Sequence, residues 1–375
     1  MLKILHTGDI HLDSPFSHLD ERRAEIRRRE VREAFSDAMT YARENGVDLV
    51  LIAGDVFDGE FVTRETAAWL QRELAALRCP VVIAPGNHDC CSPSSIWART
   101  EFPENVHIFR TAETEKFSFD DVRCDVYGYA FTAPELTECP LSGRTADDPA
   151  RINLICAHGD TSSPLSRYCP ITRAVLRDFG ADYAALGHIH NPGAIECRDG
   201  TVSAYCGSLE ARAPDETGEH GAIVAEIEKE DGTANVRTER IRFSRRRYES
   251  LTVDVTGADT LSSVEEKLAR AASDAGCGED TLLRAELRGA VAPGLVVDTK
   301  ALEASLPGLF AVRVTDATAP ALSMRELEND RTVRGEFCRA LLEKIENGSP
   351  RERRIATMAL RCGLAAMSGE EIGGV

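Results

Sequence analysis

The chain has 375 residues, of which 43% are hydrophobic and 28% are charged, so its composition is that of a globular protein and not of a disordered or membrane chain. The formal net charge of −18 disfavours tight DNA binding unless basic residues are clustered, because affinity for DNA depends on neutralising phosphates. No stretch approaches the roughly 18 uninterrupted apolar residues that span a bilayer, and the first residues lack the pattern of a secretion signal. We therefore expect no association with a membrane.

The twelve cysteines are not spaced as a disulfide framework or a zinc site. None of them forms a Cys-x-x-Cys pair, and Cys124 and Cys156 lie inside apolar, strand-like runs. Cys90 and Cys91 are adjacent in sequence, which is a poor start for a disulfide framework. The sequence therefore predicts reduced thiols that act as small hydrophobic residues in the cytoplasm.

The first two thirds of the chain alternate between apolar, β-branched runs and helical patterns. Helices are expected at residues 20–45 and 63–78, the first with Val31, Phe35 and Met39 on its apolar face. Strands are expected at residues 2–5, 47–53, 81–84, 106–109, 116–119, 123–129, 152–157, 183–186 and 221–227. This pattern predicts an α/β fold in which two sheets form a sandwich flanked by helices.

The pattern changes after an arginine run at residues 245–247. Strands at 251–255, 282–287 and 309–314 and helices at 262–275 and 299–305 predict a small α+β capping domain. Only helical signals follow, at 324–347 and 350–367, with Pro350 in the first turn of the last helix. We therefore divide the chain into a large α/β domain at 1–244, a small α+β capping domain at 245–322 and a helical region at 323–375.

Five short polar motifs each follow a predicted buried strand. They are Asp9-Ile10-His11, Gly54-Asp55-Val56-Phe57-Asp58, Gly86-Asn87-His88-Asp89, Ala157-His158-Gly159-Asp160 and Gly187-His188-Ile189-His190. Ligands in open α/β sheets bind just beyond the carboxyl ends of the strands, so five strand ends could bring these side chains to one point. One such motif alone can be an ordinary turn, but five of the nine histidines fall within the set, which favours a functional site.

The residue types in these motifs are those that bind divalent cations. The candidate ligands are Asp9, His11, Asp55, Asn87, His158, His188 and His190. Asp9 and His11 are two residues apart on extended chain and so face the same way, and Asp55 is the best-placed carboxylate to bridge two ions. Mixed nitrogen and oxygen donors suit Mn²⁺, Fe²⁺, Zn²⁺ or Ni²⁺ and disfavour Ca²⁺ and Mg²⁺.

The charge of such a centre favours an anionic substrate. Asp9 and Asp55 cancel two of the four positive charges of two divalent ions, and a bridging hydroxide cancels a third. Two metals about 3.5–4 Å apart can activate water and hold both the attacking and the leaving oxygen of a phosphate ester. His88, next to Asn87, is the candidate catalytic residue that stabilises the phosphoryl oxygens or protonates the leaving group. The sequence thus predicts a two-metal phosphoesterase.

The five motifs resemble those of the calcineurin-like metallophosphoesterases. Within that superfamily, residues 6–16, 54–58 and 205–208 are similar to the SbcD and YhaO type of DNA repair exonuclease. The resemblance covers residues 1 to about 244. It implies that Asp9, His11, Asp55 and His190 bind one ion, that Asp55, Asn87, His158 and His188 bind the other, and that His88 is catalytic. It also implies Mn²⁺ as the metal, DNA as the substrate and an SbcC-like coiled-coil ATPase that contacts the C-terminal helices.

Two other functions remain open from the sequence. One is a small-molecule phosphodiesterase or phosphatase of the same superfamily, although Asp58-Gly59-Glu60 and Asp89 fit the Asp-Arg-Gly and Glu of protein phosphatases poorly. The other is a metal-binding scaffold that regulates an ATPase. The assay that separates them offers duplex DNA, single-stranded DNA and a small diester side by side.

The basic clusters and the C-terminal helices also allow more than one interpretation. The arginines at 22–32 alternate with glutamates, which favours a helix with ion pairs over a DNA-binding track, whereas Arg245–Arg247 is the better phosphate-binding candidate. The two C-terminal helices have apolar stripes too short for a core of their own. Those stripes must pack against the chain's own capping domain, a second copy in a homodimer, or a partner helix.

Overall fold

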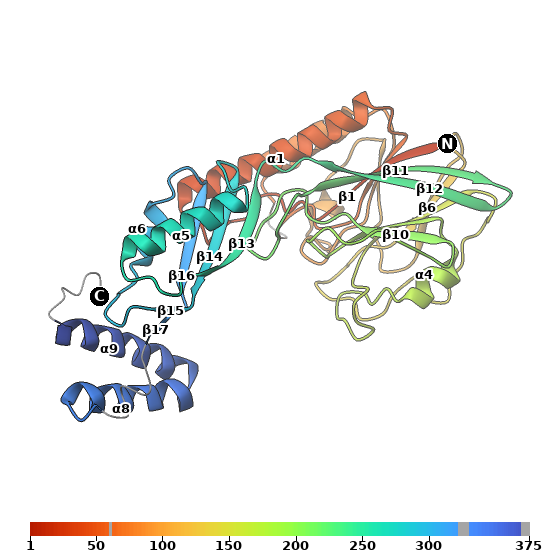
Figure 1. The fold of residues 1–375 in the computed structure, drawn as a ribbon. Coiled ribbons are helices and arrows are strands. Elements are labelled where there is room, and N and C mark those ends of the chain that lie inside the picture. The colour runs from red at the N-terminus through yellow and green to blue at the C-terminus, as the bar shows by residue number, and fades with distance from the viewer. Residues whose placement is uncertain (60–61, 322–329, 369–375) are drawn as a thin grey trace. The chain divides into compact units, whose positions relative to one another are not determined.

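The computed structural model describes residues 1–59, 62–321 and 330–368 (Figure 1). The chain forms two compact units: Met1–Arg212 with Gly218–Arg246, and Ala213–Thr217 with Arg247–Val375. The division into domains at 1–244, 245–322 and 323–375 stays a prediction.

The first unit contains two six-stranded mixed sheets. The first sheet has the order β12-β11-β1-β2-β3-β4, with β1 at Leu2–Thr7, β2 at Leu49–Ile52, β3 at Val81–Ile83, β4 at Val106–Ile108, β11 at Gly221–Glu230 and β12 at Thr233–Arg242. The second has the order β5-β6-β7-β8-β10-β9, with β5 at Glu115–Phe119, β6 at Cys124–Gly128, β7 at Ile152–His158, β8 at Tyr183–Gly187, β9 at Glu196–Arg198 and β10 at Thr201–Tyr205. Strands β1 to β4 are parallel, as are β6, β7, β8 and β10, so each sheet gathers several carboxyl ends at one edge.

Side chains that point to alternate sides of each strand explain how the two sheets pack together. Ile4, Leu51 and Val82 of the first sheet share one hydrophobic cluster with Leu154 and Tyr183 of the second. The neighbouring residues in the first sheet point the opposite way, because successive side chains of a strand face opposite sides of the sheet. The inner faces thus form the core of a sandwich, as predicted.

Helices cover the outer faces of both sheets. Helices α1 (Glu21–Glu44) and α2 (Arg64–Ala75) pack against the first sheet through a cluster that includes Phe35, Leu70 and Val50. Helix α4 (Arg173–Phe179) packs against the second sheet through Leu176 and Phe179. A short helix, α3, spans Ile96–Arg99. The four layers confirm the predicted α/β sandwich flanked by helices.

The second unit begins with alternating strands and helices. Its three-stranded parallel sheet has the order β13-β14-β16, formed by β13 (Arg247–Asp254), β14 (Thr281–Arg288) and β16 (Ala311–Asp316). Helices α5 (Leu261–Asp274) and α6 (Thr299–Ala304) connect these strands, and β15 (Ala290–Val291) pairs with β17 (Ala319–Pro320). Val264, Leu268 and Leu302 of the helices join Ala285 and Val314 of the sheet in one core.

Two helices end the described chain, α8 (Val333–Asn347) and α9 (Pro350–Ser368), and they lie side by side in Figure 1. They pack through Cys338, Leu360 and Leu364. Residues 324–329 of the predicted helix 324–347 lie outside the described residues. Among the described residues, this helix begins at Val333.

Two predictions from composition can be compared with the structure. Among the described residues, none of the helices combines the length and hydrophobicity needed to span a bilayer. The twelve cysteines all lie among the described residues and all are free thiols, as predicted.

Candidate metal centre

The predicted site residues lie at the carboxyl ends of strands from both sheets of the first unit. Asp9 and His11 follow β1, Asp55 follows β2, and Asn87 and His88 follow β3 in the first sheet. In the second sheet, His158 ends β7, while His188 and His190 follow β8. The structure brings all eight side chains together, because the strand ends of the two packed sheets meet at one place.

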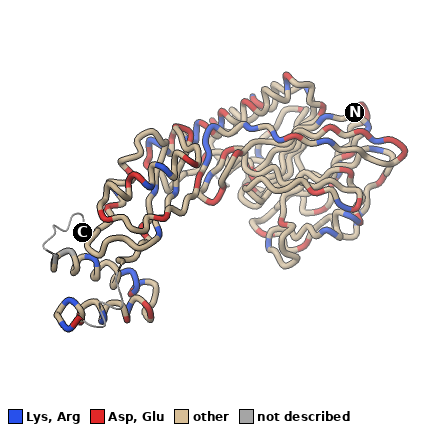
Figure 2. Tube along the Cα trace, viewed as in Figure 1, with Lys and Arg blue, Asp and Glu red and all other residues tan. Residues whose placement is uncertain are grey.

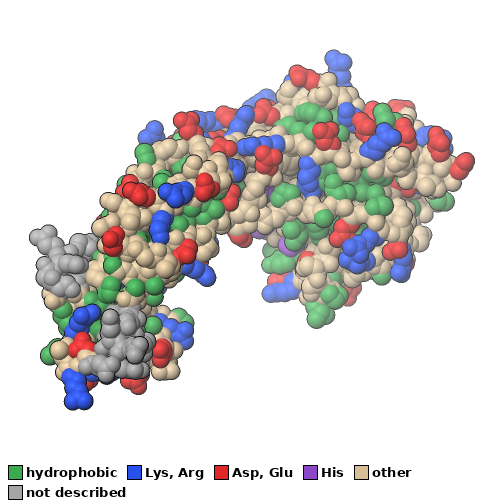
Figure 3. Space-filling model, viewed as in Figure 1, with side chains coloured by type: hydrophobic (Ala, Val, Ile, Leu, Met, Phe, Trp, Pro, Cys, Tyr) green, Lys and Arg blue, Asp and Glu red, His purple; other side chains and the backbone are tan. Residues whose placement is uncertain are grey.

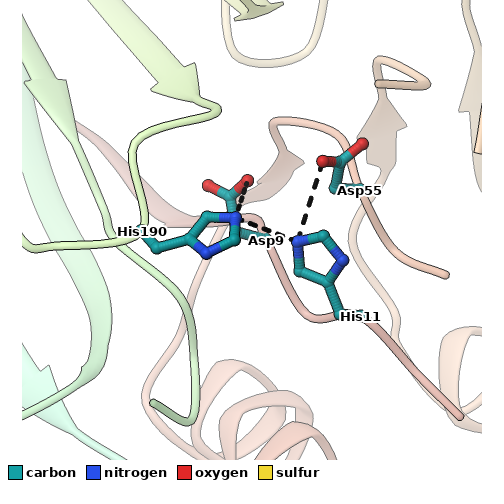
Figure 4. Close-up of side chains that lie close together, drawn as sticks. All are labelled: Asp9, His11, Asp55 and His190. Carbon is teal, nitrogen blue, oxygen red and sulfur yellow. Dashed lines mark hydrogen bonds and ion pairs between the residues drawn. The ribbon is translucent and has the colours of Figure 1, made fainter. Parts of the chain in front are cut away.

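Four of these side chains form a first cluster (Figure 4). Asp9, His11, Asp55 and His190 each offer one ligand atom, and these atoms all lie within 4.8 Å of one another. His11 Nε2 lies 3.1 Å from His190 Nε2 and 3.7 Å from Asp55 Oδ2, and His190 Nε2 lies 3.8 Å from Asp9 Oδ1. Two carboxylates and two imidazoles converging on one point fit a divalent transition metal.

A second cluster shares Asp55 with the first. Asn87 Oδ1 lies 2.9 Å from His158 Nε2 and 3.2 Å from His188 Nδ1. His158 Nε2 also lies 3.5 Å from Asp55 Oδ2, the oxygen that faces His11 in the first cluster. The Asp55 carboxylate therefore stands between two sets of donors, which is the position that a bridging ligand needs.

Hydrogen bonds behind two of the imidazoles turn their Nε2 atoms toward the centre. His158 Nδ1 lies 3.0 Å from the carbonyl oxygen of Ala53, to which it can only donate. His11 Nδ1 lies 3.1 Å from Asp58 Oδ1. Donation from Nδ1 leaves the lone pair on Nε2, which is the atom that can bind a cation. A second group of possible ligands, His11, Asp58 and His88, also contains His11 and so competes with the first cluster for this residue.

The backbone of the site loops is held in an unusual conformation. Positive φ angles occur at Asp9 (47°), His11 (50°), Asp55 (50°) and His188 (107°). For residues with a side chain such angles cost on the order of 1–3 kcal/mol each and cluster at functional sites. Contacts between motifs hold the loops: Asp9 N donates to Gly54 O at 2.9 Å, and His188 N donates to both Asp9 carboxylate oxygens at 3.0 Å.

Burial sets the charge state of several site residues. Asp9 and His11 are fully enclosed. Burial lowers the pKa of His11 well below its usual value, and the Arg212 guanidinium lowers it further. Burial also lowers the pKa of His188 to about 4. Both imidazoles are therefore neutral near pH 7 and keep a lone pair for a cation. Burial raises the pKa of Asp9, an effect that a bound cation opposes.

His88 differs from the other histidines of the site because its side chain is exposed. Its backbone N–H donates to Asp55 Oδ1 at 2.9 Å, and its ring packs edge-on against His11 with centroids 4.9 Å apart. Figure 3 shows histidine atoms reaching the surface of the first unit. An imidazole that borders the clusters and faces solvent can reach a substrate, which fits the predicted role of His88.

Three residues of the site were not among the predicted ones. Asp89 accepts hydrogen bonds from the backbone N–H groups of Gly86, Val56 and Phe57, and so ties the second motif to the third. Asp58 pairs with Arg212. Asp58 and Asp89 lie inside the motifs and could have been found by asking which acid orients each loop. Arg212 has no local signal, because it lies far along the chain from every motif.

Neither basic cluster offers a row of unpaired arginines. In α1, ion pairs join Arg27 to Glu30, Arg28 to Glu21 and Arg29 to Glu33, and Figure 2 shows basic and acidic residues interspersed along the trace.

The run at 245–247 is paired in the same way. Arg245 pairs with Asp37, Arg246 with Glu30 at 2.8 Å and Arg247 with Glu249 at 3.6 Å. These pairs weaken the interpretation of Arg245–Arg247 as a phosphate-binding cluster.

Comparisons with known proteins agree with this site. A family model described as calcineurin-like phosphoesterase matches residues 2–192. The chain is 34% identical over 280 residues to the uncharacterized metallophosphoesterase YhaO of Bacillus subtilis, covering 70% of this chain and 65% of YhaO. It thus spans less than two thirds of the length of YhaO.

Proteins named DNA double-strand break repair protein Mre11 are also similar. That of Methanopyrus kandleri is 25% identical over 389 residues, covering 93% of this chain and 84% of the relative. That of Halobacterium salinarum is 28% identical over 287 residues, covering 73% of this chain and 68% of the relative. A solved structure of a dimetal phosphatase from Danio rerio covers 65% of this chain and 99% of its own, with 14% identity and a TM-score of 0.40, too weak a likeness to support an argument.

Proposed function

We propose that this chain, which belongs to the calcineurin-like phosphoesterase family and is a metal-dependent phosphoesterase, is a nuclease that hydrolyses phosphodiester bonds of DNA. The observation that carries the proposal is the position of the Asp55 carboxylate, 3.7 Å from His11 Nε2 and 3.5 Å from His158 Nε2. Such a carboxylate can be shared by two divalent ions. The names of the Mre11 relatives support DNA as the substrate and DNA repair as the process.

The roles of the residues follow from their positions. Asp9, His11, Asp55 and His190 would hold one ion, and Asp55, Asn87, His158 and His188 would hold the other. Two bound ions supply an activated water and neutralise the charge on the phosphate. The exposed His88 contacts the phosphoryl group or gives a proton to the leaving oxygen. The donor set fits Mn²⁺ as the working metal, with Fe²⁺, Zn²⁺ or Ni²⁺ as the other candidates.

The C-terminal helices support a second part of the proposal, an SbcC-like ATPase partner in the cytoplasm. Helices α8 and α9 leave apolar side chains exposed to water: Val333 is 80% exposed, Ile355 58% and Met358 47%. Figure 3 shows hydrophobic side chains at the surface of this part of the second unit. Exposed apolar side chains on an amphipathic helix fit a groove or a partner helix. A second copy of this chain is the other candidate partner.

One comparison of substrates tests the proposed function. The purified chain with Mn²⁺ is offered linear duplex DNA, single-stranded DNA and bis-p-nitrophenyl phosphate, each with and without a chelator. We expect metal-dependent cleavage of DNA as well as of the small diester. Cleavage of the diester alone would favour a small-molecule phosphodiesterase, and no cleavage of any substrate would favour a metal-binding scaffold.

A pull-down with an SbcC-like ATPase tests the partner. We expect the parent chain to be captured, and a chain carrying Ile355→Asp and Met358→Asp to be lost from the complex while it hydrolyses the small diester as before. Arg351→Asp, at another exposed position of α9, is the matched control. Capture of the double variant at the parent level would contradict this assignment of the surface.

A further inference from the structure

One imidazole of the candidate metal centre is held from behind by a carboxylate. His11 Nδ1 lies 3.1 Å from Asp58 Oδ1, on the side of the ring opposite Asp55 and His190. Because Asp58 accepts a hydrogen bond from Nδ1–H, the Nε2 lone pair stays directed toward the cluster. Rotation of the His11 ring would break this hydrogen bond. Asp58 therefore determines which nitrogen of His11 faces a cation.

The same oxygen of Asp58 is held by an arginine. Arg212 Nη2 donates to Asp58 Oδ1 and, at 3.2 Å, to Ser14 Oγ. The side chains of Arg212 and Asp58 are only 16% and 18% exposed. Solvent screens such an enclosed ion pair less than it screens a surface pair. Arg212 thus restricts the positions that the Asp58 carboxylate can take.

The segment that carries Arg212 is itself fastened to α1 by a buried ion pair. Arg27 Nη2 donates to Glu210 Oε2 at 2.7 Å and to the backbone oxygen of Ala211 at 2.8 Å. Arg27 Nη1 donates to Glu30 Oε2 at 2.7 Å. The side chains of Arg27 and Glu210 are fully buried, so separating them would leave an uncompensated charge in the core. Residues 210 and 211 are therefore fixed immediately before Arg212.

Asp58 has other charged neighbours, and none of them replaces Arg212. His88 Nδ1 lies 3.4 Å from the backbone oxygen of Asp58, not from its carboxylate. Asp55 also lies close enough to act on Asp58 electrostatically, and two carboxylates repel each other. Without the guanidinium of Arg212 beside it, the Asp58 carboxylate could turn into the cluster and compete for a metal, or turn away and release His11.

We propose that Arg212 is a positioning residue of the metal centre: it holds Asp58, and Asp58 holds His11 with Nε2 turned toward the ion. The inference rests on the proposed function, because it requires a cation beside Asp9, His11, Asp55 and His190. A residue that only stabilises the fold would leave metal affinity unchanged once the chain is folded. A residue that only contacts the substrate would change KM and not metal affinity.

The test is a calorimetric titration of the metal-free, full-length chain with Mn²⁺. For Arg212→Ala we expect about 10- to 100-fold weaker affinity for one of two ions, the size of effect that partners of metal ligands have elsewhere. Both ions should still bind at saturation, and KM for bis-p-nitrophenyl phosphate at saturating Mn²⁺ should match the parent. Arg212→Lys keeps the positive charge and should recover most of the affinity.

A matched control and a double variant complete the test. Arg242→Ala removes an arginine that pairs with Glu219 in the same unit, and it should bind Mn²⁺ as the parent does. Asp58→Asn combined with Arg212→Ala should bind Mn²⁺ no more than about twofold more weakly than Asp58→Asn alone, because the two residues act in series.

Three results would overturn the inference: parent-like affinity in Arg212→Ala, an increase in KM without a change in affinity, or losses that multiply in the double variant. If Arg212→Ala does not fold, Arg212→Gln, which keeps most of the side chain, decides by the same criteria. A parent chain that binds no Mn²⁺ would overturn the proposed function itself, and this inference with it.

Discussion

Gly86 and Asp55 are so close that a β-carbon on Gly86 would lie 2.2 Å from Asp55 Oδ1. The third motif therefore approaches the central carboxylate of the second to a distance that only glycine permits. The same Asp55 oxygen accepts a hydrogen bond from the backbone N–H of His88 at 2.9 Å. The glycine before Asn87 thus belongs to the geometry of the metal centre and does more than end a strand.

Gly86→Ala should displace the Asp55 carboxylate and weaken the binding of both ions. We expect metal-dependent hydrolysis of a small diester to fall by about 100-fold or more, because small displacements of reacting groups cost this much. Gly59→Ala is the control, since a β-carbon at Gly59 has no heavy atom within 4 Å. Equal activities of the two variants would show that the close approach at Gly86 has no functional consequence.

Asp55→Asn should abolish most metal-dependent hydrolysis while the chain stays folded. The substitution removes the charge that lies between the two donor clusters, so we expect fewer than two Mn²⁺ ions per chain in a calorimetric titration. Circular dichroism checks the fold. Activity within a few-fold of the parent would be incompatible with a carboxylate shared by two ions.

His88→Ala should separate catalysis from metal binding. The exposed His88 is expected to act on the phosphate and not on a metal, so the variant should still bind about two ions per chain and turn over ~100-fold or more slowly. Metal analysis and kcat are measured on the same preparation. A drop in metal content would mean that His88 is itself a ligand.

Arg361→Ala should destabilise the second unit without affecting the chemistry of the first. The buried Arg361 of α9 pairs with Asp316 and donates to the backbone oxygen and hydroxyl of Thr318. Removing one partner of a buried ion pair costs about 3–5 kcal/mol, which denaturant unfolding would detect as an earlier transition. Arg351→Ala, on the exposed face of the same helix, is the control. Hydrolysis of the small diester under native conditions should be equal in both variants.

The sequence was sufficient to predict which side chains converge at the candidate site, because each motif is local. Every candidate ligand directly follows or ends a strand, so the pattern that predicts the strand also places the ligand at its carboxyl end. The order of the motifs then allowed the side chains to converge, and the structure brings Asp9, His11, Asp55 and His190 within 4.8 Å of one another. Their role as metal ligands stays a prediction.

The sequence was less informative where polar residues form secondary structure. Strand β12 (Thr233–Arg242) was not predicted, because six of its ten residues are exposed and polar and only Ala234, Val236, Thr238 and Ile241 are half-buried. In α1, the apolar stripe and the ion pairs were predicted, but the burial of Arg27 and Glu30 was not. Glu30 is a local partner of Arg27, but its second partner, Glu210, arrives from elsewhere in the chain, and the local pattern does not contain it.

The sequence by itself determined the α/β sandwich, the family and the candidate ligands at the strand ends, since strand periodicity and strand-end motifs depend on neighbours along the chain. The tertiary structure alone decided the pairing of the arginines. Arg245 and Arg246 follow one another without an intervening acid, yet Asp37 and Glu30 of α1 neutralise them across the fold. Arg212 reaches Asp58 in the same way, because ion pairs form between side chains that folding brings together, however far apart they lie in the sequence.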